Sequence, residues 1–127
     1  MSLRVDVFII RDDDDFVVLD VPEGVSDLAG FESWRRTIWG SDTVRSLGAE
    51  FLPQLKCESW VRIPPHKVWG FMEEIALLQN NLELIAMRQG DARKSFVQNV
   101  YEIGSRLNNF HAAAQRALSI RGGVIIW

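Results

Sequence analysis

Cysteine and histidine are scarce in this sequence of 127 residues, which contains one cysteine and two histidines. The single thiol of Cys57 cannot form an internal disulfide, so the chain differs from small secreted domains that disulfides hold together. Cys57, His66 and His111 have no short spacing that would place two of them on one helical face, so we predict no metal site. A catalytic pair of Cys57 and His111 has no local motif to support it, and we predict that the protein is not an enzyme.

Long apolar runs are also missing. No segment approaches the roughly 20 apolar residues that span a bilayer. The first residues show the strand-like alternation of Val5, Val7 and Ile9, and not the apolar stretch of a signal peptide. We therefore expect a cytoplasmic protein with no membrane partner. The 14 basic and 17 acidic side chains give a net charge of −3, which argues against a general nucleic-acid binder.

Motifs for cofactors and for acid–base chemistry are absent as well. The glycines fit neither the dinucleotide-binding fingerprint nor the phosphate-binding loop of nucleotide hydrolases, so we predict no cofactor. The two neighbouring acids Glu73 and Glu74 are expected on the outer, solvated side of a helix. In that position they would not act as a general acid and base.

The N-terminal residues predict a β-hairpin. Residues 5–10 and 16–21 are rich in β-branched and aromatic side chains, and a charged loop separates them. The second of these strands is apolar on both faces, which predicts a covered, central position in the sheet. A short strand over residues 57–63 and a last strand over residues 124–127 are also expected, the latter against the hairpin.

Apolar spacing of three and four residues predicts two short and two long helices. Ser26 or Asp27 caps the first short helix, and Ser41 or Asp42 caps the second. The first long helix is predicted over residues 66–88. Asp91 is predicted to cap the second. The first short helix is expected to turn Leu28, Phe31, Trp34 and Ile38 inward. The inward-facing residues expected for the last long helix are Val97, Val100, Gly104, Leu107, His111, Ala114 and Leu118.

Together these elements predict one α+β domain over residues 1–127. A small mixed or antiparallel sheet would pack against the two long helices, which pair as an antiparallel αα-hairpin, and against the two short helices. The 127 residues contain enough apolar side chains for one continuous hydrophobic core.

The hairpin loop carries four consecutive acids, Asp12, Asp13, Asp14 and Asp15. Their spacing resembles the start of a calcium-binding loop, but apolar strand residues fall where such a loop needs an oxygen ligand and a glycine. The repulsion among four like charges favours either a solvated loop or a role in binding a partner.

Tryptophan is frequent, with five residues at positions 34, 39, 60, 69 and 127. Tryptophan and arginine dominate binding hot spots, and residues 34–39 concentrate both types. Trp34 is expected in the core, whereas Trp39 could lie in the core or at the surface. The predicted partner-binding residues are Asp12, Asp13, Asp14, Asp15, Arg35, Arg36 and Trp39.

Residues 27–35, 39–41, 46–49, 107–109 and 123–127 resemble small actinobacterial-type immunity proteins of polymorphic toxin systems. That resemblance implies a compact, acidic, intracellular α+β domain that binds a cognate toxin and blocks its active site, with no catalytic residues. Two alternatives stay open. One is a homo-oligomeric structural or regulatory module, such as a homodimer, and the other is a small enzyme with a site around Cys57 and His111.

Overall fold

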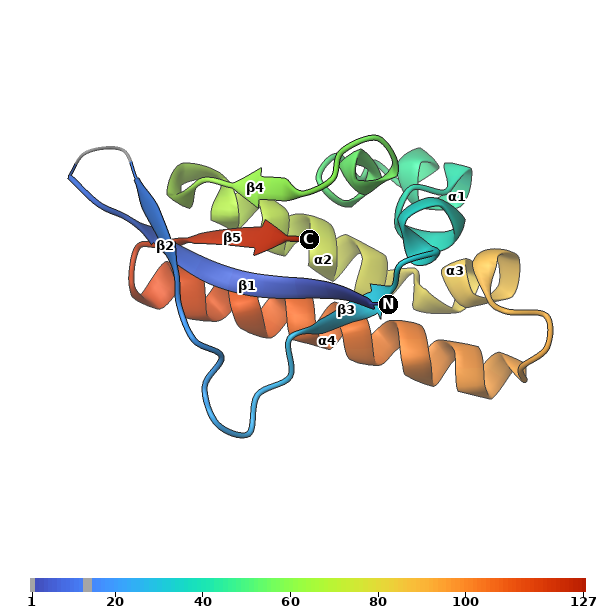
Figure 1. Ribbon diagram of the computed structural model, residues 1–127. Coiled ribbons are helices and arrows are strands. Elements are labelled where there is room, and N and C mark those ends of the chain that lie inside the picture. Colours follow the sequence, from blue (N-terminus) through green and yellow to red (C-terminus); the bar gives the residue numbers. More distant parts are fainter. Residues whose placement is uncertain (1, 13–14) are drawn as a thin grey trace.

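The computed structural model describes residues 2–12 and 15–127, and its sheet is organised by one nine-residue strand. This strand, β1 (Ser2–Ile10), pairs antiparallel with β2 (Phe16–Val18), β3 (Leu28–Phe31) and β5 (Gly123–Ile126). β5 pairs in turn with β4 (Val61–Ile63), which gives the order β2-β1-β5-β4 with β3 also on β1 (Figure 1). The predicted hairpin, the C-terminal strand against it and the α+β class are confirmed.

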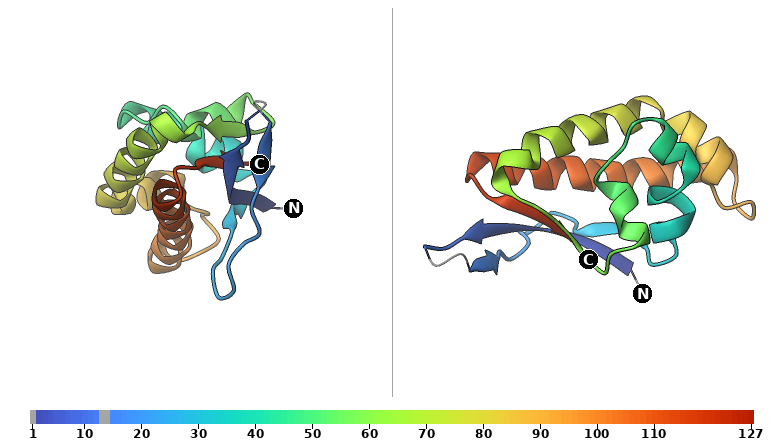
Figure 2. Two further views of the ribbon diagram at one scale, coloured as in Figure 1. Left: turned by 90° about the vertical axis from the view of Figure 1, so that its left-hand side faces the viewer. Right: turned by 90° about the horizontal axis from the view of Figure 1, so that it is seen from above.

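The helices lie on one side of this sheet (Figure 2). They are α1 (Asp42–Ser46), α2 (Val68–Asn80), α3 (Leu82–Gln89) and α4 (Phe96–Ser119), together with the short turns η1 (Arg35–Trp39), η2 (Leu52–Lys56) and η3 (Pro65–Lys67). Within the described residues, no helix is both long and apolar enough to cross a membrane.

The predicted first helix is wrong in its N-terminal half, because residues 28–31 form strand β3. These residues pair antiparallel with β1, and Ala29 and Gly30 are buried while Leu28 and Phe31 stay partly exposed. Gly30 has φ +117°, a value that no helix contains and that side chains other than glycine rarely adopt. The chain turns helical only from Arg35, where the π-helical turn η1 buries Ile38 and Trp39.

The predicted long helix over residues 66–88 is two helices, because helical geometry is interrupted at Asn81. Asn81 leaves helical geometry, and its side-chain amide donates to the backbone carbonyl of Leu77 at 2.9 Å. Asparagine side chains compete for backbone groups in this way, which disfavours the middle of a helix. The proline pair does precede the helix as predicted, through the turn η3.

The start of α4 also differs from the prediction. Ser95 caps the helix by accepting a hydrogen bond from the backbone N–H of Gln98 at 3.1 Å, whereas Asp91 lies in the preceding loop. The predicted inner face is right in part: Leu107 and Ala114 are buried and Val100 and Leu118 pack against the core, whereas Val97 is exposed and His111 is half-buried. The residues that α4 buries are Asn99, Ile103, Leu107, Phe110, Ala113, Ala114 and Ala117.

Strand β2 lies at the edge of the sheet, not at its centre as predicted. Its residues are apolar on both faces because Phe16 packs against neighbours on the face away from the helices. The ring of Phe16 meets Phe8 edge-to-face with centroids 5.2 Å apart. The apolar pattern thus reflects aromatic packing on the outer face of the sheet.

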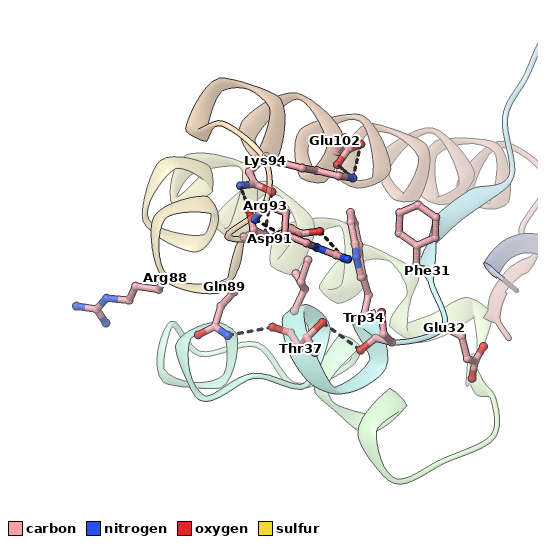
Figure 3. Close-up of a pocket in the computed structure, with 14 residues that line it drawn as sticks. Phe31, Glu32, Trp34, Thr37, Arg88, Gln89, Asp91, Arg93, Lys94 and Glu102 are labelled. Atoms are coloured by element: carbon pink, nitrogen blue, oxygen red, sulfur yellow. Dashed lines mark hydrogen bonds and ion pairs between the residues drawn. The ribbon is translucent and has the colours of Figure 1, made fainter.

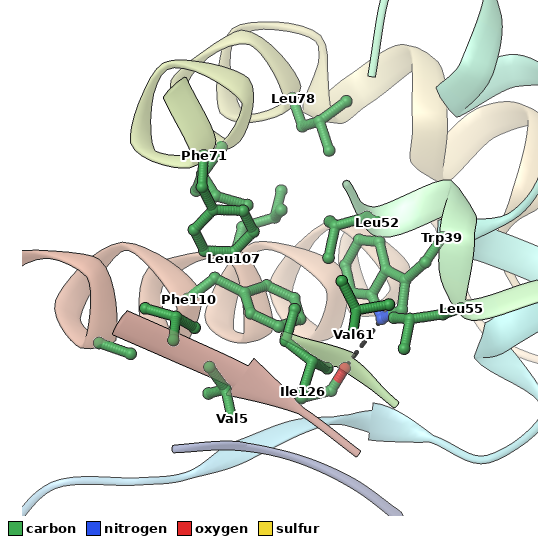
Figure 4. Close-up of a cluster of buried hydrophobic side chains, with 14 of the residues drawn as sticks. Val5, Trp39, Leu52, Leu55, Val61, Phe71, Leu78, Leu107, Phe110 and Ile126 are labelled. Atoms are coloured by element: carbon green, nitrogen blue, oxygen red, sulfur yellow. Dashed lines mark hydrogen bonds between the residues drawn. The ribbon is translucent and has the colours of Figure 1, made fainter. Parts of the chain in front are cut away.

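The core lies between the sheet and helices α2 and α4 (Figure 4). Its centre is a chain of edge-to-face aromatic contacts, in which Phe110 of α4 meets Trp39 at 5.4 Å and Phe71 of α2 at 6.0 Å between ring centroids. Val5 and Ile126 pack against these aromatic rings from the sheet. Most buried hydrophobic residues of the described chain form one continuous cluster, while Phe8 and Ile125 are buried outside it.

Candidate functional site

A pocket of about 710 Å³ lies between the β3–η1 segment and the α3–α4 loop (Figure 3). Its volume falls within the roughly 300–1,000 Å³ of small-molecule sites. One wall is aromatic and apolar, formed by Phe31, Trp34 and Ile38, and the other walls are polar. The polar lining residues are Glu32, Ser33, Thr37, Arg88, Gln89, Asp91, Arg93, Lys94, Asn99 and Glu102.

The aromatic wall is positioned by the close packing of Gly30 on Trp34. A Cβ at Gly30 would lie 2.5 Å from Cε3 of the Trp34 ring, so only glycine allows the ring to occupy this place. Phe31 then meets the Trp34 ring edge-to-face at 5.8 Å. This tight local packing makes the wall a rigid part of the pocket.

Two amides hold the opposite wall. Gln89 accepts a hydrogen bond from the Thr43 hydroxyl at 2.8 Å and donates one to the backbone carbonyl of Thr37 at 2.9 Å. Asn99, which is buried in α4, both accepts from and donates to the backbone of Asp91 at 3.0 Å. The contacts of Gln89 tie the end of α3 to α1 and η1, and those of Asn99 tie the α3–α4 loop to α4.

Ion pairs surround the mouth of the pocket. Arg93 donates two hydrogen bonds to the carboxylate of Asp91 through its side chain, at 3.0 and 3.1 Å. These bonds, together with one from the backbone N–H of Arg93, lower the pKa of Asp91 to about 2. Lys94 pairs with Glu102 at 2.8 Å and lies 5.7 Å from the centre of the Phe31 ring. The lining carries three acidic and three basic side chains, so its charges balance, and Asp91, Arg93, Lys94 and Glu102 are held in pairs.

The predicted partner-binding residues do not gather in one place. Asp12 and Asp15 are exposed at the end of the hairpin, while Asp13 and Asp14 lie outside the described residues. Arg35 and Arg36 follow β3, which pairs with the opposite end of β1. Nine residues of β1 separate the two ends by about 26 Å, at roughly 3.3 Å a residue.

Two of these residues also have structural contacts. Trp39 is fully buried, and its indole N–H donates to the carbonyl of Ala29 at 2.9 Å, so its side chain belongs to the core. Arg35 donates to the carbonyls of Glu58 and Ser59, both at 2.9 Å, and thus holds the end of η2. Arg36 is exposed.

A second surface that the sequence analysis did not identify lies beside the acidic loop. Trp60 keeps 46 % of its surface exposed, and its ring lies 6.4 Å from that of Phe16. The guanidinium of Arg62 lies 5.1 Å above the Phe16 ring. Ile10, the last residue of β1, is also exposed. We call Ile10, Asp12, Asp15, Phe16, Trp60 and Arg62 the hairpin-end surface.

The residues considered for catalysis lie elsewhere. Cys57 was expected to be partly buried in a strand, but it is exposed at the end of η2. Neither Cys57 nor His111 lines the pocket. His66 is exposed, as expected. Within residues 2–12 and 15–127, no three His, Cys, Asp or Glu side chains are placed to hold a metal ion.

Glu74 was expected in solvent and is instead buried on α2. Its carboxylate accepts hydrogen bonds from the backbone N–H groups of Glu50, Phe51 and Leu52. Burial raises the pKa of Glu74, and these three bonds offset part of that rise. The residue is a structural anchor for the segment before η2. Glu73 is exposed, as predicted.

Comparisons of this chain with protein-family models, with curated proteins and with solved structures found no match.

Proposed function

We propose that this chain is a protein-binding domain, and specifically an immunity protein that binds a cognate toxin and covers its active site. The observation that supports this most is the exposed Trp60 beside the acidic hairpin loop. The Phe16 ring lies 6.4 Å from the Trp60 ring, and the guanidinium of Arg62 lies over Phe16 in turn. A large aromatic side chain loses little freedom on binding when its neighbours already hold it, and such residues dominate binding energy in interfaces.

The charge of the loop indicates what kind of partner fits this surface. Residues 11–15 carry one arginine and four aspartates, a net charge of −3. Acidic groups at the rim of an interface speed association with a basic partner and contribute less to holding the complex together. Toxins that attack nucleic acids have basic clefts, and an acidic loop flanked by an aromatic anchor complements such a cleft.

The test first asks whether a neighbouring gene encodes a toxin domain, and then measures binding kinetics and rescue of growth with that domain. Wild-type protein should bind and restore growth. Replacing Asp12 and Asp15 by lysine should slow association on the order of tenfold at low salt, and the effect should shrink at high salt. Trp60→Ala should mainly speed dissociation, since it removes an anchor rather than a charge.

The matched control replaces Glu73 and Glu83 by lysine, which makes the same charge change on exposed helical positions away from the hairpin. This variant should associate nearly as fast as the wild type. An equal loss of on-rate in both double variants would show that only net charge matters, and it would refute the role of the hairpin-end surface. No binding to the neighbouring toxin at all would refute the immunity function.

A different observation favours a second candidate, a homo-oligomeric module. Val97 and Tyr101 are one helical turn apart on α4, and they expose 76 % and 75 % of their surface. Exposed apolar side chains next to one another on a helix suit an interface between copies. Sedimentation should then show a dimer that Tyr101→Lys dissociates. A wild-type protein that sediments as a monomer at about 1 mM, a concentration at which even weak dimers form, would refute this candidate.

A further inference from the structure

Trp34 is buried, and its indole N–H donates a hydrogen bond to no group of the described residues. Trp39 donates to the carbonyl of Ala29, and Trp127 donates to the carboxylate of Asp6, both at 2.9 Å. Only 8 % of the Trp34 side chain is exposed, and that part lines the pocket. The indole nitrogen itself is not sealed off from solvent, so this N–H is open to the pocket. The pocket therefore presents a donor that a bound molecule can satisfy.

Arg93, which also lines the pocket, offers a second donor. Arg93 uses Nε and Nη2 for its pair with Asp91, so Nη1 remains to donate elsewhere. Figure 3 shows Trp34, Arg93 and Asp91 among the side chains that line this same pocket. The negative charge of Asp91 is already neutralised by Arg93. Two donors in one pocket with an aromatic wall match a group with two acceptor oxygens.

We propose that this pocket binds a small aromatic carboxylate. Its ring packs against Phe31, Trp34 and Ile38, and its carboxylate accepts hydrogen bonds from the Trp34 indole N–H and from Arg93. The balanced ion pairs around the mouth leave no strong field of either sign, so recognition depends on these two directed bonds and on the apolar wall. This site lies at the end of β1 opposite the hairpin loop, and the proposal does not depend on a protein partner.

The test uses 2-naphthoate as the probe and 2-naphthamide, which has the same shape without the charge, as its control ligand. Calorimetry measures affinity, and NMR of the five indole N–H groups reports the site. The signal of Trp34, identified by its disappearance in Trp34→Phe, should shift on addition of naphthoate while the other four stay in place. Naphthoate should bind about tenfold more tightly than naphthamide, the factor expected for a charge-assisted bond.

Arg93→Gln gives an independent variant, because this exposed side chain can be replaced without disturbing the core even if Trp34→Phe fails to fold. It should weaken naphthoate binding about tenfold and leave naphthamide binding unchanged. Lys67→Gln removes a positive charge outside the pocket and should change neither affinity. The proposal is overturned if naphthoate does not bind at about 10 mM, beyond which affinity is negligible. It is equally overturned if the two probes bind alike, or if Arg93→Gln and Lys67→Gln have the same effect.

Discussion

The carboxylate of Glu74 accepts a hydrogen bond from the backbone N–H of Leu52 at 2.9 Å, and it accepts two more from Glu50 and Phe51. One buried side chain on α2 thus satisfies three donors of the segment that leads into η2. Glu74→Ala would leave these N–H groups without a partner, each at a cost of about 1–3 kcal/mol. We expect a loss of unfolding free energy of about 3 kcal/mol or more by urea denaturation, against less than about 0.5 kcal/mol for exposed Glu73→Ala. Equal losses in the two variants would contradict the structural role of Glu74.

Glu74 also makes stability depend on pH. Burial raises its pKa in the folded protein above the ordinary value of 4.5, so the folded state binds its proton more tightly than the unfolded state does. The stability that protonation of Glu74 contributes is fully present below pH 4.5, and it is lost as pH rises through the pKa of the folded state. The difference in unfolding free energy between wild type and Glu74→Gln should therefore shift in favour of the wild type as pH falls from 7 to 4. A difference that stays constant over this range would show that the pKa is not raised.

The position of Glu74 could not be predicted from the sequence, because its partners lie 22 to 24 residues earlier in the chain. Local patterns did predict β1 and β5, because residues 5–9 alternate with period two and residues 124–127 form a short apolar run. The pocket was missed for the same reason as Glu74. Its two walls come from residues 31–38 and 88–102, and no local motif connects them.

Gly30 explains why the first helix was predicted where a strand exists. The spacing of Leu28, Phe31 and Trp34 is helical, but the left-handed backbone of Gly30 and its contact with the Trp34 ring require an extended segment. Gly30→Ala should destabilise the protein by more than about 2 kcal/mol, through both backbone strain and the clash. Gly24→Ala is the matched control, because Gly24 also has positive φ but has open space around it. Thermal unfolding should show the larger loss for Gly30→Ala, and a reversed order would contradict the described packing.

Trp39 and Trp60 differ in burial, a difference that composition alone does not reveal. Trp39 is fully buried, whereas Trp60 keeps about half of its surface exposed. Trp39→Ala should cost about 3–5 kcal/mol of unfolding free energy, because it leaves a cavity between Trp34 and Phe110. Trp60→Ala should cost less than about 1 kcal/mol. Fluorescence quenching by iodide gives a second measurement, in which the Trp60→Ala variant should lose more of the quenchable signal than Trp39→Phe does.

Asp91 provides a test of the pocket that needs no ligand. Its paired hydrogen bonds to Arg93 favour the charged carboxylate, which lowers the pKa from 3.8 to about 2. A titration followed by NMR of the side-chain carbonyl carbon should place the midpoint of Asp91 near 2. In Arg93→Gln the midpoint should rise toward the ordinary value, since the cation and the side-chain donors are gone. Lys94→Gln should move the midpoint much less, because Lys94 pairs with Glu102 and affects Asp91 only through its charge. A midpoint near 3.8 in the wild type would mean that Arg93 is not held against Asp91 in solution. The Nη1 donor assigned to the pocket would then have no fixed position, so this titration also decides whether Arg93 can direct a ligand.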